Sequence, residues 1–240
     1  FTSAEDYKKR VIQMGENPSR VFNVGAPGIE NIRRTQLLTK TELEETLNFD
    51  FGEAPLLVTY HPVTMQEDGG LVEYENLLVA LEERLADHQI VLTYPNADAQ
   101  GALLASLLEG FASKHPARIF LAKSLGRISY LSLMNISAAV IGNSSSGVIE
   151  APAIGVPTVD IGSRQNGRIR PSSVIIAEGD LDSIRSALAT ALTDTHRQIS
   201  RTYAHPFGDG TASEKIVSTI ASTNFQEILQ KKFFDLGGLE

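Results

Sequence analysis

The sequence predicts an α/β fold, a Rossmann-like doubly wound parallel sheet. From residue 54 onward, short apolar segments alternate with helical segments of about a dozen residues, which is the pattern of consecutive βα units. The apolar segments are apolar throughout rather than at every second position, as expected of strands that are covered on both faces. Turns rich in glycine and polar residues follow several of these strands, where such sheets bind ligands.

Each element of this sheet has its own segment. Predicted strands span 56–60, 90–94, 118–122, 138–142, 156–161 and 173–177. Predicted helices span 71–86, 101–113, 127–134, 147–153 and 181–192. Because the polar turns that follow parallel strands share one edge of the sheet, residues far apart in sequence are expected to meet there.

The flanking segments carry weaker signals. A helix is predicted over 3–14, capped by Ser3 and ended by Gly15, followed by a strand over 20–24. The segment 41–47 is predicted to form a short amphipathic helix. Thr211 and Glu214 are spaced as a capping box, which predicts a further helix from that point.

Composition excludes several function classes. The 240 residues are 21% charged and 42% apolar, which is typical of a folded globular protein. A net charge of −8 argues against general attraction to nucleic acid or to an anionic membrane, and no run approaches the roughly 18 apolar residues of a membrane span. With no cysteine, the chain has no disulfide and no thiolate ligand or nucleophile. The remaining histidines, His88, His115, His196 and His205, lack metal-ligand spacing and are expected at the surface or at caps, so we predict no metal.

The clearest candidate site is the segment 142–150, in which a strand leads through three serines into a helix. A helix N-terminus presents backbone N–H groups and a partial positive charge, so a phosphate fits there, with serine hydroxyls as further donors. Glu150 on that helix could accept hydrogen bonds from a ribose diol. Alternatively, Ser144 to Ser146 only cap the helix and Glu150 is a solvated acid, and the residues alone favour neither interpretation.

Three further turns end at the same predicted edge. His61 directly follows a strand and could donate to a diphosphate or transfer a proton, unless it is an ordinary loop histidine. Asn96 and Asp98 could bind a ligand, although capping of the following helix explains them as well. Three arginines between residues 164 and 170 could hold a pyrophosphate, the alternative being a surface loop.

Several motifs taken together resemble the hydrolysing UDP-N-acetylglucosamine 2-epimerases. The most specific are GNSSSGVIEAP at 142–152, GVPT at 155–158 and IGSRQNGR at 161–168. Similar blocks in the same order are VTYHPVT at 58–64, YPNAD at 94–98, SLG at 124–126 with YL at 130–131, and GDGTAS at 208–213. The resemblance extends from Val21 to about Ile220.

This resemblance implies a GT-B-like enzyme that converts UDP-N-acetylglucosamine and water into N-acetylmannosamine and UDP, for the synthesis of sialic acid type sugars. It implies no cofactor, and UDP and UDP-N-acetylglucosamine as partners. The resemblance implies that Ser144 and Ser145 hold the diphosphate and that Glu150 holds the ribose hydroxyl groups. It implies that Arg164 lies on the nucleotide side of its loop and that His61 contacts the diphosphate or assists departure of the leaving group. It also implies that Asn96 and Leu125 help to frame UDP.

The same resemblance divides the chain into 1–28, the end of an N-terminal Rossmann-like domain; 29–53, a linker; 54–206, the UDP-binding domain; and 207–240, a C-terminal helix and tail. The family's catalytic acids would precede Phe1, so we expect this chain to bind UDP without turning over substrate by itself. A cytoplasmic homo-oligomer is expected for the full-length protein. Two alternatives are a GT-B glycosyltransferase that uses a UDP-sugar and a non-catalytic regulatory domain that binds nucleotide-sugars.

Overall fold

A computed structural model describes residues 1–64, 66–96, 101–202 and 204–235. The chain forms two compact units. Unit 1 contains Phe1–Thr35 together with Ala204–Glu240, and unit 2 contains Gln36–Tyr203. The predicted segments 1–28 and 207–240 therefore belong to the same unit, unit 1, whereas the sheet lies in unit 2.

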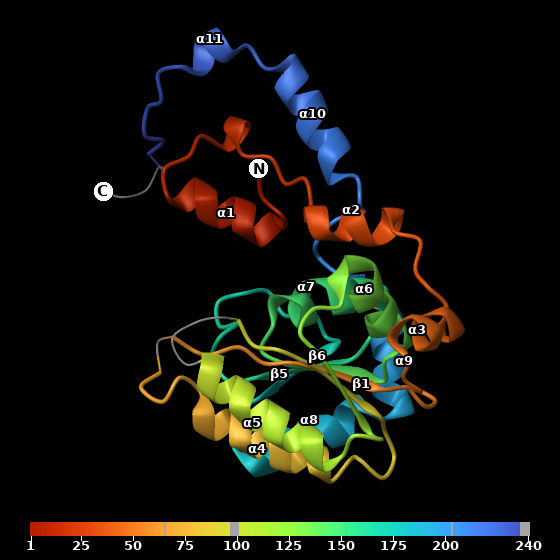
Figure 1. Cartoon of the computed structure of the whole chain (residues 1–240). Helices are drawn as coiled ribbons and strands as arrows, with labels where there is room; N and C mark the ends of the chain where they lie inside the picture. The colour runs from red at the N-terminus through yellow and green to blue at the C-terminus, as the bar shows by residue number, and fades with distance from the viewer. Residues whose placement is uncertain (65, 97–100, 203, 236–240) are drawn as a thin grey trace. The chain divides into compact units, whose positions relative to one another are not determined.

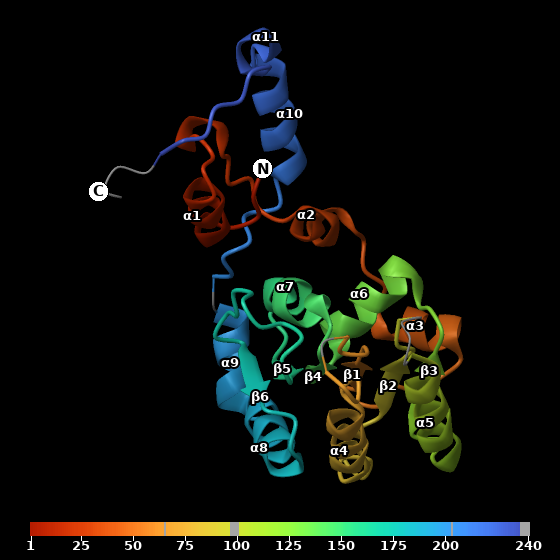
Figure 2. The same cartoon turned by 90° about the vertical axis from the view of Figure 1, so that its left-hand side faces the viewer.

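Unit 2 is built on a parallel sheet of six strands in the order β3-β2-β1-β4-β5-β6 (Figure 2). The strands are β1 (Leu56–Thr59), β2 (Ile90–Thr93), β3 (Ile119–Ala122), β4 (Ala139–Gly142), β5 (Thr158–Ile161) and β6 (Val174–Ala177). Each neighbouring pair runs parallel. The strand order reverses between β1 and β4, so their carboxyl ends flank the switch point at which doubly wound sheets bind ligands.

Helices cover both faces of this sheet (Figure 1). On one face lie α4 (Leu71–Glu82), α5 (Gly101–Lys114) and α8 (Leu181–Ala191), and on the other lie α3 (Lys40–Leu47), α6 (Gly126–Ile136) and α7 (Ser145–Ile154). A further helix, α9 (Asp194–Thr202), contacts α7 and α8. This arrangement confirms the predicted Rossmann-like doubly wound sheet.

The pleat of the strands distributes their apolar side chains between two core layers. Leu56 and Val58 of β1 pack in the layer formed with α4, α5 and α8, whereas Leu57 packs in the layer formed with α3, α6 and α7. All three are at most 2% exposed. Because successive side chains point to opposite faces, a strand that is buried on both faces must be apolar throughout, which is the signal that the sequence carries.

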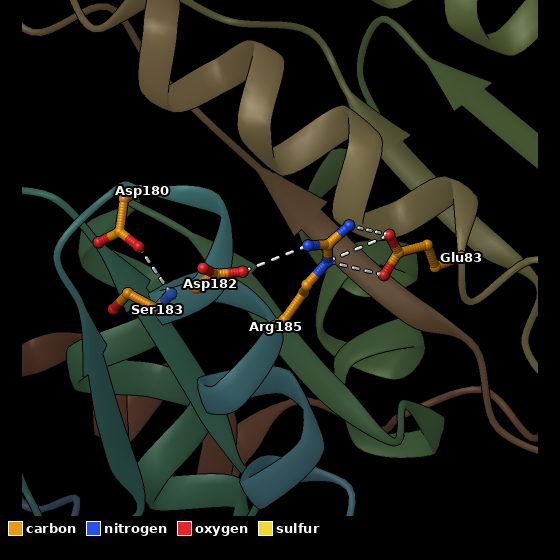
Figure 3. A network of polar contacts seen from close by, with 5 residues as sticks. All are labelled: Glu83, Asp180, Asp182, Ser183 and Arg185. Atoms are coloured by element: carbon orange, nitrogen blue, oxygen red, sulfur yellow. Dashed lines mark hydrogen bonds and ion pairs between the residues drawn. The ribbon is translucent and has the colours of Figure 1, made fainter.

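Polar contacts fix α8 against α4 (Figure 3). The Arg185 guanidinium donates to both carboxylate oxygens of Glu83 and, at 3.3 Å, to Asp182. At the start of α8, Asp180 accepts a hydrogen bond of 2.9 Å from the backbone N–H of Ser183. The side chains of Arg185 and Glu83 are partly exposed, so their ion pair contributes little to stability. The Asp180 cap satisfies an N–H group at the start of α8.

Unit 1 contains α1 (Glu5–Gln13), the 3₁₀ helix Pro18–Arg20, α2 (Pro27–Arg34), α10 (Ala212–Ser222) and α11 (Phe225–Ile228). Glu30 of α2 is buried, and its carboxylate accepts a hydrogen bond of 2.7 Å from the backbone N–H of Ser213. The Arg34 guanidinium lies 2.6 Å from the same carboxylate. The hydrogen bond lowers the pKa of Glu30, and it links two segments that are far apart in the sequence.

Several predictions for the flanking segments are wrong. The predicted strand at 20–24 is reduced to one parallel bridge between Thr2 and Asn23, because no ladder partner lies beside it among the described residues. Helix α1 has Ala4, not Ser3, at its N-cap. Thr211 is at the N-cap of α10, but its hydroxyl donates to Asp209 and forms no capping box. Residues 27–34, for which no helix was predicted, form α2.

Two outcomes concern unit 2. His196 was expected at the surface or at a cap but is buried, with Nε2 3.2 Å from the carbonyl oxygen of Ser173. The predicted helix at 41–47 is confirmed as α3, with a complete capping box between Thr39 and Glu42.

In the part of the chain that the structure describes, no helix has the length and hydropathy needed to cross a membrane.

Candidate nucleotide-binding site

A pocket of about 400 Å³ lies at the carboxyl edge of the sheet, next to the switch point. Its lining comes from the ends of β1 to β4 and the starts of α6 and α7, and includes Thr59, His61, Leu125, Tyr130, Ser144 and Ser146. Three predicted site residues, His61, Leu125 and Ser144, thus come together. This convergence follows from the parallel sheet, which brings all these turns to one edge.

The serine loop both caps a helix and faces the pocket. Ser144 is the N-cap residue of α7, and its Oγ accepts a hydrogen bond of 3.4 Å from the backbone N–H of Ser146. Ser144 therefore caps the helix, as the capping interpretation predicts, whereas Glu150 is partly buried rather than a solvated acid. A cap uses a lone pair of the hydroxyl, so it is compatible with an anion that receives the hydroxyl proton at the positive end of α7.

A second helix begins at the same pocket. Leu125 is the N-cap residue of α6 and supplies no side-chain cap. Two helices thus present their positive ends to one cavity, one at Leu125 and one at Ser144. That arrangement favours a ligand with negative charge.

Hydroxyl groups on the pocket wall form a site feature that sequence reasoning did not single out. The Tyr130 hydroxyl lies 2.6 Å from Oγ of Ser146, and Oγ1 of Thr59 lies 2.8 Å from Oγ1 of Thr93. Burial raises the pKa of Tyr130, so its hydroxyl stays protonated at neutral pH. The tyrosine occurs in a segment that resembles the family, but its sequence position alone gave no sign that it reaches the serine loop.

His61 is held by a backbone contact to its ring. The backbone N–H of Asn96 donates to Nδ1 of His61 at 3.1 Å. Because Nδ1 uses its lone pair as an acceptor, the neutral ring carries its proton on Nε2, the tautomer that can donate to an anion. The side chain of Asn96 is exposed, so its observed contribution is through the backbone. Asp98 and the predicted cap of the next helix lie outside the described residues.

The other predicted residues do not line this pocket. Ser145 and Glu150 both lie on α7, in its first and second turns. Burial raises the pKa of the Glu150 carboxyl, and the charge of Arg168 partly opposes this effect. Arg164 donates to the backbone carbonyl of Asn143 at 3.1 Å.

The third arginine of the loop has a structural partner. Arg170 donates to the carboxylate of Asp160 at 2.7 Å and to the side chain of Asn166 at 2.9 Å. Asp160 is 1% exposed, so the ion pair compensates a buried charge at the end of β5. Arg164 and Arg170 are thus both engaged within the protein, Arg164 by a backbone carbonyl and Arg170 by a buried carboxylate.

A second cavity of about 400 Å³ lies at the opposite edge of the sheet, where the strands begin. Its lining includes Ser137, Ile154, Gly155, Pro157 and Arg201. Helices α6 and α7 end there, so the cavity faces the negative ends of these helices. The lining of that cavity also includes Lys40, Arg197 and Glu53. The carboxyl-edge pocket offers hydroxyl groups, an imidazole, Arg127 and two positive helix ends, so it supplies the donors that an anionic ligand needs. No carboxylate is among the residues described as lining that pocket.

Several known proteins resemble this chain in sequence. The sequence model of a family described as UDP-N-acetylglucosamine 2-epimerase matches residues 1–221. A Campylobacter jejuni protein named GDP/UDP-N,N'-diacetylbacillosamine 2-epimerase (hydrolyzing) is 35% identical over 237 residues, which are 98% of this chain and 61% of that protein. The polysialic acid biosynthesis protein P7 of Escherichia coli is 32% identical over 210 residues, 86% of this chain and 52% of that protein.

A solved structure of similar fold is UDP-GlcNAc 2-epimerase from Neisseria meningitidis bound to UDP-GlcNAc, with a TM-score of 0.76 and 17% identity over 93% of this chain and 61% of that one. This likeness confirms the predicted fold, a Rossmann-like sheet of the GT-B type. The chain spans less than two thirds of the length of these relatives.

Proposed function

We propose that this chain, which belongs to the UDP-N-acetylglucosamine 2-epimerase family, provides the UDP-binding part of a hydrolysing 2-epimerase. The observation that carries the proposal is the pocket in which His61 and Ser144 meet beside two helix N-termini. Such a site binds the diphosphate of a nucleotide without a metal, because helix ends, hydroxyl groups and an imidazole supply the donors.

The proposed roles follow from positions in and beside the pocket. Ser144 and Ser145, at the start of α7, hold the diphosphate. His61 donates from Nε2 to the diphosphate and assists its departure, since Nδ1 is occupied by the backbone of Asn96. Leu125 and the Asn96 segment frame the nucleotide.

Two side chains outside the pocket lining complete the proposed nucleotide site. Glu150 accepts from the ribose hydroxyl groups, and Arg164 lies on the nucleotide side of its loop. The raised pKa of Glu150 reflects a carboxylate that burial makes costly, and hydrogen bonds from a diol would compensate part of this cost.

The proposed reaction consumes UDP-N-acetylglucosamine and water and yields N-acetylmannosamine and UDP. The bond between the anomeric carbon and the diphosphate oxygen breaks as the C2 proton is removed. Water then adds to the resulting glycal, and C2 regains a proton on the opposite face. No carboxylate is described among the pocket's lining residues, so we assign removal of the C2 proton to none of them.

A second candidate differs only in the sugar. The Campylobacter jejuni relative is named for a diacetylbacillosamine substrate, which carries a further acetamido group. Release of the free 2-epimerised sugar from each of the two UDP-sugars by the full-length protein separates the candidates. Sugar transfer that requires an added acceptor would instead support the glycosyltransferase alternative. A homo-oligomeric state and a cytoplasmic location stay predictions.

The test is calorimetric titration of UDP into this chain, with CMP as the control ligand. We expect selective binding of UDP, and its loss in Glu150→Ala. Glu75→Ala serves as the matched control because Glu75 is an exposed acid on α4, away from the pocket. Equal affinity for UDP and CMP, or no loss in Glu150→Ala, would contradict the proposal. Release of N-acetylmannosamine from UDP-N-acetylglucosamine by the 240-residue chain alone would refute the expectation that it binds UDP without turning over substrate.

A further inference from the structure

Asn143 is a fully buried residue between β4 and the serine loop, with an exposed fraction of 0%. The roles proposed above do not use it. Its buried side-chain amide has one acceptor and one type of donor, and both must be satisfied within the protein. The partners that satisfy them show what the residue does.

Both partners of the amide are backbone groups of His61. Oδ1 of Asn143 accepts from the backbone N–H of His61 at 2.7 Å, and Nδ2 donates to the carbonyl oxygen of His61 at 2.8 Å. The backbone N–H of Asn143 also donates to the carbonyl oxygen of Thr59 at 3.2 Å. The side chain thus extends the pairing between β1 and β4 past the last strand residues, up to the histidine.

The backbone carbonyl of Asn143 is also engaged, by the loop after β5. It accepts from Nε2 of Gln165 at 2.7 Å and from the guanidinium of Arg164 at 3.1 Å. Gln165 is 1% exposed, so this contact is buried. One residue therefore joins three segments at the carboxyl edge: the turn that carries His61, the serine loop, and the arginine loop.

We infer that Asn143 is a positioning residue that sets the orientation of the His61 imidazole toward the diphosphate of the bound nucleotide. Only a side-chain amide places an acceptor against the His61 N–H and a donor against the His61 carbonyl oxygen at the same time. Aspartate keeps the acceptor but places a second carboxylate oxygen against the His61 carbonyl, at the position of the 2.8 Å contact. The role in UDP binding rests on the proposed function, whereas the effect on the His61 ring in the chain without ligand does not.

The first test needs no ligand. Nitrogen NMR of the imidazole rings in the free chain reports the tautomer of His61, assigned by comparison with His61→Gln. We expect the Nε2–H tautomer in the wild type and a clear loss of its dominance in Asn143→Asp. Asn76→Asp is the matched control, because Asn76 also donates to a backbone carbonyl, that of Gly179, at 3.0 Å. Unchanged His61 signals in a folded Asn143→Asp variant would overturn the inference.

The second test separates positioning from general damage. We expect Asn143→Asp to weaken UDP binding roughly tenfold in the wild type, but less than about twofold in a His61→Gln background. Equal losses in both backgrounds would contradict positioning through His61. If Asn143→Asp does not fold, Gln165→Met decides: a smaller change of the His61 signals in the same direction supports the inference, and unchanged signals refute it.

Failure of the proposed function has a different signature. If the wild-type chain does not bind UDP, the titration refutes nucleotide binding, and the NMR comparison of the free chains still decides whether Asn143 orients His61.

Discussion

Replacing Gly142 with alanine tests the close approach on which the pocket depends. Gly142 ends β4 with φ +127°, a conformation that residues with a side chain rarely adopt. A Cβ at this position would lie 2.0 Å from the carbonyl oxygen of Thr59 and 2.7 Å from its carbonyl carbon. These atoms belong to the backbone of β1 and cannot rotate away, so the strands would have to separate.

The magnitude follows from two contributions. A disfavoured backbone conformation costs about 1–3 kcal/mol, and forcing a backbone shift in a packed core costs about 1–3 kcal/mol more. We therefore expect Gly142→Ala to lower the free energy of unfolding by about 2–6 kcal/mol. Since a domain of this kind is stable by about 5–15 kcal/mol, the loss is large enough to measure by urea denaturation followed by circular dichroism.

Two other glycines separate the contributions. Gly167 has φ +81° but open space around a Cβ, so Gly167→Ala should show only the conformational cost. Gly110 lies inside α5 with open space around a Cβ, so Gly110→Ala should gain about 0.5–1 kcal/mol. A loss in Gly142→Ala no larger than that in Gly167→Ala would refute the argument that β4 must approach β1 so closely.

Three further predictions address charge and capping. Arg170→Leu should lower the free energy of unfolding at neutral pH by about 3–5 kcal/mol, because the carboxylate of Asp160 stays buried without its partner; a loss below about 1 kcal/mol in a urea titration would contradict this. Burial raises the pKa of Glu150 in the folded state, so folding becomes less favourable as the pH rises from about 4.5, the ordinary pKa of a glutamate, through the folded pKa. Glu150→Gln should therefore gain stability over the wild type above that range and none below it, and an equal difference at all pH values would argue against the burial effect. Thr39→Ala should cost about 1 kcal/mol through loss of the capping box of α3, with no change expected in UDP affinity.

The sheet of unit 2 could be predicted because its signals are local. Each strand is a short apolar run that must be buried on both faces, and the parallel alternation leaves few possible topologies. The meeting of His61 with Ser144 was predictable for the same reason, since strand ends of one sheet share an edge. Several predicted strand bounds differ from the observed ones by one or two residues. Tyr60 and Tyr94, for example, fall just beyond the observed ends of β1 and β2.

What could not be predicted depends on partners distant in sequence. Whether residues 20–24 form a strand depends on a neighbouring strand, and only the bridge to Thr2 is present among the described residues. Proline suits the first position of a helix, and α2 begins at Pro27. The buried side chains of α9 are His196 and Ser200 rather than apolar residues, so its buried face carries no apolar signal in the sequence. The role of the Asn143 amide could not be predicted from the sequence, because it depends on the hydrogen bonds to His61, 82 residues away in the sequence.

The most direct test of the central claim, that this chain binds UDP at the carboxyl edge of its sheet, is to map UDP onto the chain by amide chemical-shift changes in NMR. We predict that the largest changes fall on His61, on residues 124–126 and on residues 144–147, which line or adjoin the proposed pocket. Changes concentrated at Ser137, Gly155 and Arg201, around the cavity at the opposite edge, would contradict the account, as would a spectrum that UDP leaves unchanged.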